Sequence, residues 1–308
     1  MPISVISTIL TALTFLAVML VAGNNLSACV GPAIGSRIIT KRFGMLIGAT
    51  GFTTGLLIQG TEMTKSVSVL MPNSTAELRV TALLVAILVF VIADIARVPM
   101  SLSMSLVGLL SGLSFTSGSS SNAIYILKVA ILWILAPLIA ILSGLYLVRA
   151  LNHNWPRNFW QRLQAYKLLL IIFSFTTAFV LGANTLGLVV ATGGFDLITV
   201  LAAIVAIFIG AFFLSGGAIR RISQEFYLMR YTDAFATMIT DTILVELATL
   251  FNIPLSNTQT TASAAFGTGI GYRSKFVSLR PFFIIVAGWI AAPLISFSIG
   301  VFVRSAVL

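Results

Sequence analysis

The sequence predicts an all-α polytopic membrane protein with two homologous repeats that contain broken or re-entrant helices. Three observations support this: a very apolar composition, long apolar stretches, and an internal duplication of short motifs. Of the 308 residues, 58% are apolar and 8% are charged. A soluble domain carries about 25% charged residues. This composition excludes a soluble enzyme, a soluble nucleic-acid-binding domain and a disordered chain.

The apolar stretches are long enough, or nearly so, to cross the hydrocarbon core of a bilayer as helices, which takes about 20 residues. They fall near residues 3–22, 43–60, 78–96, 124–148, 166–182, 196–214, 234–251 and 277–303. Because they are continuous rather than alternating, they predict helices and not a β-barrel. Most of the 18 Lys and Arg residues lie between them, as in the loops of membrane proteins. We therefore expect a multi-pass protein in contact with lipid, and no nucleic-acid partner.

Short motifs recur in the same order in both halves of the chain. Trp133-Ile-Leu-Ala-Pro returns as Trp289-Ile-Ala-Ala-Pro, and Pro99-Met-Ser-Leu-Ser returns as Pro254-Leu-Ser-Asn-Thr. The pair Gly-Asn24 recurs as Ala-Asn184. We expect a first transmembrane repeat at 1–149, a polar linker at 150–165 and a second repeat at 166–308. The residues alone leave open whether the repeats are inverted.

Four segments rich in Gly, Ser, Thr and Asn lie between the apolar stretches, at 22–36, 98–116, 182–194 and 254–272. They are apolar enough for membrane depth but poor as uninterrupted helices. Broken backbone at that depth is tolerated only where it is buried in protein or lines a wet cavity. Interrupted segments at corresponding places of duplicated halves indicate the substrate site of a secondary transporter.

The donors in these segments are uncharged. A break exposes helix N-termini, which attract anions, and hydroxyl and amide groups can donate to the oxygens of an oxyanion. The same residue types also hold ordinary transmembrane helices together, and the repetition of the set is what favours a site. The expected anion-binding residues are Asn24, Asn25, Asn184, Thr185, Ser101, Ser103, Ser256, Asn257, Thr258 and Gln259.

Three carboxylates are candidates for coupling transport to a cation. Asp241 and Glu246 lie within an apolar stretch, and Asp94 lies shortly before Pro99. Ionisable groups at membrane depth are costly and usually functional. The alternative is a place near the headgroups or an ion pair, such as Asp94 with Arg97. With one His, one Cys and no nucleotide-binding or nucleophile motif, we expect neither enzyme activity nor a cofactor.

The interrupted segments resemble those of the inorganic phosphate transporter (PiT) family, which includes sulfate-permease-like members. Residues 22–36, Ala-Gly-Asn-Asn-Leu-Ser-Ala-Cys-Val-Gly-Pro-Ala-Ile-Gly-Ser, resemble that family's Gly-Ala-Asn-Asp-x-Ala-Asn-Ala-x-Gly-Thr-x-x-Gly-Ser. Gly182-Ala-Asn-Thr185 resembles the second copy. Pro254-Leu-Ser-Asn-Thr-Gln259 resembles Pro-Val-Ser-Thr-Thr-His, and Pro99-Met-Ser-Leu-Ser-Met104 is a weaker first copy. The resemblance covers both halves over nearly the whole chain.

The resemblance implies an inverted-repeat, alternating-access symporter of inorganic phosphate in the cell membrane, usually coupled to sodium and often a homodimer. The departures concern the coupling ion. The family's Asp is Asn25 in the first copy and Thr185 in the second, and its loop His is Met104 and Gln259. At most a weak sodium site remains at Asn25 and Thr185, so the coupling ion is sodium or a proton. A sulfate permease of the same family and a passive anion channel stay open as alternatives.

Overall fold

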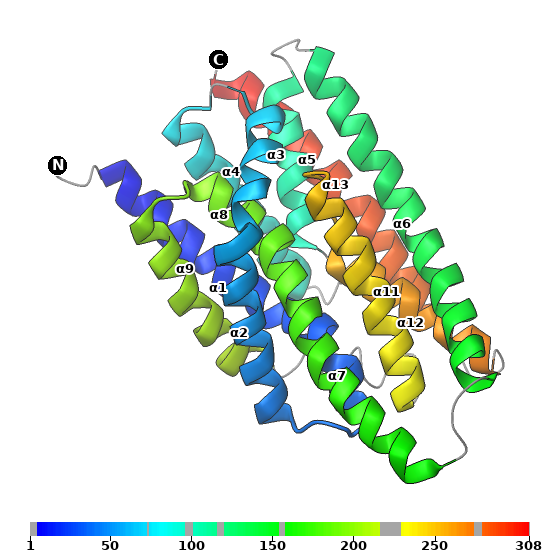
Figure 1. Cartoon of the computed structure of the whole chain (residues 1–308). Helices are drawn as coiled ribbons and strands as arrows, with labels where there is room; N and C mark the ends of the chain where they lie inside the picture. Colours follow the sequence, from blue (N-terminus) through cyan, green and yellow to red (C-terminus); the bar gives the residue numbers. More distant parts are fainter. Residues whose placement is uncertain are drawn as a thin grey trace.

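The computed structural model describes residues 5–72, 74–95, 101–115, 120–153, 158–215, 229–273 and 279–307, and this part of the chain is helical without any strand (Figure 1). The helices are α1 (Val5–Gly35), α2 (Lys41–Gln59), α3 (Met63–Leu70), α4 (Ala76–Ile95), α5 (Leu102–Ser114), α6 (Ser120–His153), α7 (Phe159–Leu181), α8 (Gly187–Gly193), α9 (Leu197–Ile209), α11 (Tyr231–Leu250), α12 (Asn257–Arg273) and α13 (Leu279–Val307). A 3-10 turn, η1 (Gly60–Glu62), joins α2 to α3, and π-helical turns η3 (Gly182–Leu186) and η4 (Gly210–Leu214) continue α7 and α9.

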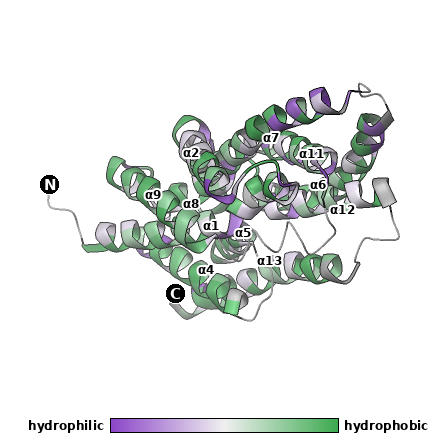
Figure 2. Ribbon diagram, turned by 90° about the horizontal axis from the view of Figure 1, so that it is seen from below, coloured by the Kyte–Doolittle hydropathy of each residue, from purple (hydrophilic) through white to green (hydrophobic). Residues whose placement is uncertain are grey.

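Six helical segments of the described chain are long and apolar enough to cross a membrane: Val5–Gly35, Lys41–Leu70, Ala123–Asn152, Trp160–Gly193, Leu197–Leu214 and Phe282–Ala306. Large apolar side chains such as Ile58, Ile134 and Phe302 are exposed on the outer helices, where lipid would cover them. Hydrophilic residues instead gather toward the middle of the bundle and at helix ends (Figure 2). The chain is a multi-pass membrane protein, as its composition predicts.

The two halves of the chain run in opposite directions. In Figure 1 the start of α1 and the end of α13 lie toward the upper side of the molecule, whereas α6 ends and α7 begins at the lower side. Helices α4 and α5 of the first half correspond to α11 and α12 of the second, with starts 155 residues apart in both pairs. The repeats are therefore inverted, which the residues alone had left open.

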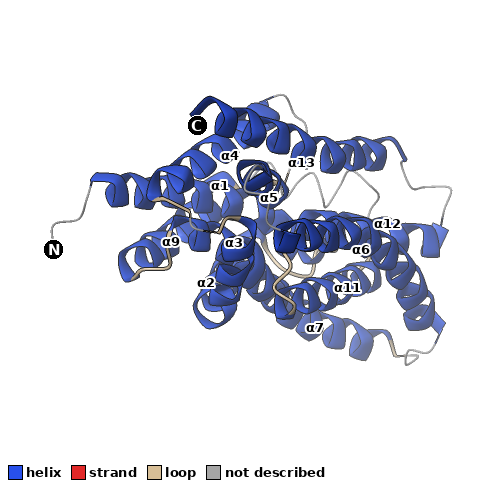
Figure 3. Cartoon of the chain, turned by 90° about the horizontal axis from the view of Figure 1, so that it is seen from above, coloured by secondary structure: helices blue, strands red, loops and turns tan. Residues whose placement is uncertain are grey.

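Each half packs its helices against the other half. The most extensive contacts join α5 to α13 and α12 to α6, and two further equivalent pairs join α2 to α7 and α1 to α9. Seen from above, α5 lies near the centre with α13 beside it (Figure 3). Because every one of these pairs crosses between the halves, neither half has a complete core of its own.

Glycines permit the closest of these contacts. A Cβ atom added at Gly112 on α5 would lie 2.2 Å from the carbonyl oxygen of Phe297 on α13. At Gly267 on α12 it would lie 2.1 Å from the carbonyl oxygen of Ile141 on α6. Helices in a bilayer associate largely through such close packing, since lipid tails are as apolar as leucine. Two equivalent glycines thus set the helix spacing in both of these pairs between the halves.

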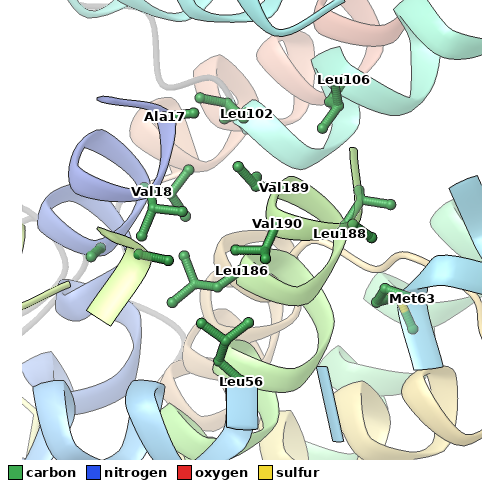
Figure 4. Close-up of a cluster of buried hydrophobic side chains, with 14 of the residues drawn as sticks. Ala17, Val18, Leu56, Met63, Leu102, Leu106, Leu186, Leu188, Val189 and Val190 are labelled. Carbon is green, nitrogen blue, oxygen red and sulfur yellow. The ribbon is translucent and has the colours of Figure 1, made fainter. Parts of the chain in front are cut away.

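The largest apolar cluster surrounds α8 (Figure 4). Val189 of α8 lies among Ala17 and Val18 from α1 and Leu102 and Leu106 from α5. Leu102 and Leu106 are themselves 2% and 0% exposed. The N-terminal part of α5 therefore belongs to the hydrophobic core in the first half.

The interrupted segments differ from one another, and one prediction about them was wrong. Residues 22–36 are not broken, because α1 continues through Pro32 to Gly35. A continuous helix satisfies its own backbone groups, which the membrane favours. Segment 182–194 is interrupted by the π turn η3, and segment 254–272 forms an extended tip followed by α12. In segment 98–116, α5 begins at Leu102, and residues 96–100 lie outside the described part.

The linker prediction overlaps two helices. Helix α6 runs on to His153 and α7 begins at Phe159, so residues 150–165 are helical at both ends. Residues 154–157 lie outside the description. The division of the chain into repeats at 1–149 and 166–308 stays a prediction.

Candidate substrate and cation site

The second half carries a buried tip between α11 and α12. The backbone turns at Asn252, whose φ of 56° is in the left-handed region, and then extends through Pro254 to Ser256. The carbonyl group of Ser256 accepts the backbone N–H of Gln259 at 3.0 Å and so starts α12. The Ser256 and Thr258 hydroxyl oxygens are 3.0 Å apart. This tip places a hydroxyl pair at a buried helix N-terminus.

The first half repeats this arrangement at the start of α5. Ser101 is the N-cap residue, and its carbonyl group accepts the backbone N–H of Ser105 at 3.0 Å. Its hydroxyl oxygen lies 2.8 Å from that of Ser103, and both side chains are buried. Four of the predicted anion-binding residues therefore form two equivalent pairs, Ser101 with Ser103 and Ser256 with Thr258.

Asn184, in the π turn η3, is fully buried and bonds to the second tip. Its Nδ2 group donates to the hydroxyl of Thr249 and to the carbonyl oxygen of Ile253, each at 3.0 Å. Its Oδ1 atom accepts the backbone N–H of Leu255 at 3.0 Å. The amide thus fixes the end of α11 and the extended tip. The neighbouring Thr185 hydroxyl is buried and has no hydrogen-bond partner within the described chain.

Asn24 and Asn25 lie on the continuous helix α1. The Nδ2 group of Asn24 donates to Oδ1 of Asn25 at 3.4 Å, and Asn25 is buried whereas Asn24 is half-buried. Helix α1 packs against α11 and α12 as well as against α4. The two amides therefore lie on the helix that contacts both helical hairpins, α4–α5 in the first half and α11–α12 in the second.

Two further predicted residues contact protein groups rather than an open space. Asn257 donates from Nδ2 to Oδ2 of Asp241 at 2.6 Å. Gln259 donates from Nε2 to the carbonyl oxygen of Trp133 at 2.8 Å, and the Trp133 indole N–H donates to the carbonyl oxygen of Pro254 at 2.9 Å. In the sequence Trp133 marked only the duplication, so its contact with the tip was missed.

The tip has a second pair of anchors that the sequence did not indicate. The hydroxyl groups of Ser66 on α3 and Tyr125 on α6 donate to the carbonyl oxygen of Asn252, at 2.6 and 2.5 Å. Neither residue lies in an interrupted segment, and nothing in the sequence relates them to Asn252. The left-handed turn of the second half is thereby tied to two helices of the first half.

The three candidate carboxylates lie in different surroundings. Asp241 is 0% exposed and accepts hydrogen bonds from Asn257 and from the hydroxyl of Thr260. Glu246 is half-buried, and its Oε1 atom accepts from Nε2 of Gln59 at 3.0 Å. Asp94 lies in the last turn of α4, and its side chain is outside the described part. Of the two carboxylates whose side chains the structure describes, Asp241 is the fully buried one.

The structure joins some of these groups and not others. Asn184 reaches the second tip, and Asn257 reaches Asp241. Within the described residues no hydrogen bond connects the Ser101 pair to the Ser256 pair or brings Asn25 to Thr185. A pocket of about 470 Å³, lined in part by Lys65 and Arg79, lies elsewhere and includes none of the predicted anion-binding residues.

Comparison with known proteins agrees with the motifs. The model described as "Phosphate transporter family" matches residues 21–181 and again residues 157–300. A protein of Methanocaldococcus jannaschii described as "Putative phosphate permease" is 25% identical over 288 residues, which is 94% of this chain and 93% of that protein. A solved structure titled "The sodium-dependent phosphate transporter" has the same fold, with a TM-score of 0.82, 15% identity, and coverage of 99% of this chain and 100% of that chain. The chain belongs to the phosphate transporter family, and its function is to carry phosphate across the membrane that its helices span.

Proposed function

We propose that the chain is a secondary active symporter that moves inorganic phosphate by alternating access, together with a cation. The observation that carries this proposal is the pair of equivalent buried tips, where Ser101 with Ser103 and Ser256 with Thr258 place hydroxyl pairs at the starts of α5 and α12. A helix N-terminus adds partial positive charge from its free N–H groups. Donors of this kind suit a tetrahedral oxyanion.

Neutral donors are important for transport and not only for binding. Removing a divalent anion from water costs tens of kcal/mol unless other groups replace the water. Several hydroxyl and N–H donors must therefore converge on the phosphate at once, while the absence of a full positive charge lets it leave again. In this mechanism one group of helices rocks against the rest and exposes the anion on each side in turn.

The predicted site residues divide into two groups under this proposal. Ser101, Ser103, Ser256 and Thr258 contact the anion directly. Asn184, Asn257 and Gln259 position the second tip, because their amides already bond to protein groups. Asn24, Asn25 and Thr185 remain candidates for the anion or for a weak sodium site.

The cation and the assembly belong to the same proposal. A co-transported cation balances the charge of the anion, and Asp241, Glu246 and Asp94 are the candidate carboxylates that would couple it. Sodium and the proton are the two candidate ions, and the protein acts in the lipid bilayer as a homodimer. We propose no enzymatic step and no cofactor.

Two other transport functions are separated by one experiment. Purified protein in liposomes is given labelled phosphate or labelled sulfate, with sodium and proton gradients imposed separately. We expect phosphate to accumulate and sulfate not to do so, in keeping with the family. A passive channel would equilibrate phosphate without accumulating it under a cation gradient, and preferential accumulation of sulfate would indicate a sulfate permease.

Variants then test the site itself. Ser101→Ala and Ser256→Ala each remove one donor from a tip, and we expect the phosphate concentration for half-maximal uptake to rise several-fold in both. Ser298→Ala is the matched control, because its exposed hydroxyl bonds only to its own helix, at the carbonyl oxygen of Leu294. Unchanged uptake in both tip variants would contradict the proposed site.

A further inference from the structure

The two hairpins share a backbone plan but differ in chemistry. Positions of α11 and α12 correspond to positions of α4 and α5 that lie 155 residues earlier. By this correspondence Asp241 matches Ala86, Asn257 matches Leu102, Thr260 matches Ser105 and Thr261 matches Leu106. All eight side chains are buried. The second hairpin therefore has a buried polar cluster, which we define as Asp241, Asn257, Thr260 and Thr261. At the four corresponding positions of the first hairpin, three of the side chains are apolar.

The polar cluster is connected internally by neutral groups. Asn257 donates to one carboxylate oxygen of Asp241 and Thr260 to the other. Thr261 donates to Oδ1 of Asn257 at 3.4 Å. The ion pairs within the described chain are Lys65 with Glu62 and Arg230 with Asp233, so none of them involves Asp241. No basic side chain of the described residues balances its charge.

The first hairpin shows that the fold does not require this cluster. There Leu102 and Leu106 pack into the apolar core beside Val189 (Figure 4), and Ala86 takes the place of the carboxylate. Ser105, the counterpart of Thr260, keeps a hydroxyl that is 0% exposed and has no hydrogen-bond partner in the described chain. An apolar set therefore packs the same kind of helix pair, and the polar set in the second half needs another explanation.

An uncompensated carboxylate is expensive in this position. A single charge buried in a low-dielectric interior costs several kcal/mol even after the surroundings relax. Two neutral donors, Asn257 and Thr260, reduce that cost but leave the charge itself. Adding one proton removes the charge, and both carboxylate oxygens are already held by neutral donors, Asn257 on one and Thr260 on the other.

We propose that Asp241 is the group that binds the co-transported proton, and that the chain has one such site, in its second half only. One proton from water on the side to which the site is open joins a carboxylate oxygen, which changes the charge from −1 to 0, and it leaves to water on the opposite side. Asn257 and Thr260 hold the carboxyl group in place in both states. This inference rests on the proposed function, since it names the ion that accompanies phosphate.

Few other titratable groups can take this role near Asp241. The elements packed against α11 are α1, α6, α7, α12 and η3. On α1 the Cys29 thiol is buried within electrostatic range of Asp241. On α7, Arg162 and Tyr166 lie beside Tyr231 at the far end of α11. On α6 and α7 other ionisable side chains are exposed or reach beyond the end of α11: Tyr125, Lys128, Tyr146, Arg149 and Lys167. The side chains of His153, Tyr272 and Arg273 are outside the described part, and η3 has no titratable group.

The test compares two kinds of phosphate transport in liposomes without sodium. Net accumulation is driven by an imposed pH gradient, and exchange of labelled for unlabelled phosphate is measured at equal pH on both sides. We expect Asp241→Asn to lose pH-driven accumulation and to keep exchange, because exchange needs no net proton movement. Asp196→Asn is the matched control, since it makes the same change outside the membrane-spanning segments, and it should keep both activities.

The outcomes separate this inference from the proposed function. Wild-type accumulation under a sodium gradient but not under a pH gradient would overturn the proton site and leave phosphate symport standing. Accumulation under neither gradient would instead refute the proposed function. Undiminished pH-driven accumulation in Asp241→Asn would remove Asp241 from the mechanism.

A second variant decides the case in which Asp241→Asn loses exchange as well. Thr260→Ala keeps the carboxyl group but removes one of its hydrogen-bond donors. We then expect the pH at which uptake is half-maximal to shift. An unchanged pH dependence in Thr260→Ala would overturn the proposal.

Discussion

The two equivalent glycine contacts give a sharp test of the inverted-repeat packing. Replacing Gly267 by Ala puts a Cβ atom 2.1 Å from the carbonyl oxygen of Ile141, and replacing Gly112 puts one 2.2 Å from that of Phe297. Contacts become ordinary only beyond 3.4 Å. Each pair of helices must therefore separate by roughly 1 Å, which weakens close contacts along the whole interface.

The magnitude follows from two opposing contributions. Overpacking of an interior costs about 1–3 kcal/mol, and the upper end applies here because the opposing atom belongs to a rigid backbone. Alanine in place of glycine stabilises a helix by about 1 kcal/mol. We therefore expect a net loss of about 2 kcal/mol for each variant. The equal geometry of the two contacts predicts nearly equal losses.

Thermal unfolding of the detergent-solubilised protein, followed by tryptophan fluorescence, measures this effect. Gly44→Ala is the matched control, because its added Cβ would meet only side-chain atoms of Ile34 and Ile39, the nearest being the flexible end of Ile34 at 3.0 Å. We expect that control to unfold at or slightly above the wild-type temperature. The equivalence of the two interfaces is refuted if Gly112→Ala and Gly267→Ala unfold at the same temperature as the control, or if only one of them unfolds at a lower temperature.

Three other predictions concern single side chains. Asn184→Ala should destabilise the protein by about 2–5 kcal/mol in thermal unfolding, since it leaves the carbonyl group of the half-buried Ile253 and the N–H group of the buried Leu255 without partners. A loss of phosphate affinity without any loss of stability would instead mark Asn184 as a ligand. Asp196 caps α9, and although partial burial opposes its ionisation, hydrogen bonds from Thr199 outweigh this and lower its pKa. The ionised Asp196 therefore contributes fully to stability above about pH 4, the pKa of an aspartate in the unfolded chain, and this contribution is lost as the pH falls through the lower folded pKa. The unfolding temperature of Asp196→Asn should depend less on acid pH than that of the wild type. The same pH profile in both proteins would contradict the cap. Trp133→Phe removes the indole donor to the carbonyl group of Pro254 in the second tip, and it should lower the free energy of unfolding by about 1 kcal/mol in the same assay. An unchanged unfolding temperature would show that this hydrogen bond is absent.

Much of the fold could be predicted because the membrane imposes it. Hydrocarbon cannot hydrogen-bond to the backbone, so long apolar stretches had to be helices. The same rule explains the error at residues 22–36: the helix bonds to itself through Pro32, and the Gly and Asn residues that suggested a break are accommodated on a continuous α1. The sequence indicated where unusual residues gather, but not which of them interrupt the backbone.

The site was predictable in composition and much less so in its contacts. Repeated Ser and Thr residues indicated the two tips, and each pair flanks the first residue of a helix, Leu102 of α5 or Asn257 of α12. The role of Asn184 depends on Ile253 and Leu255, and that of Gln259 on Trp133, which are far away in the sequence. An amide looks the same in a sequence whether it faces a ligand or a neighbouring carbonyl group, so only the fold could separate these cases.

The packing of helices from one half against helices of the other also affects how the chain is synthesised. Helix α5 is complete at Ser114, but its principal neighbour α13 begins only at Leu279. At about 5–20 residues per second, synthesis leaves α5 waiting for roughly 10–30 s before its permanent partner leaves the ribosome. Throughout that interval the glycine face of a short helix lies uncovered in the insertion machinery or the lipid. A chain released before α13 would therefore be a natural substrate for membrane quality control, even though about nine-tenths of its 308 residues had already been joined.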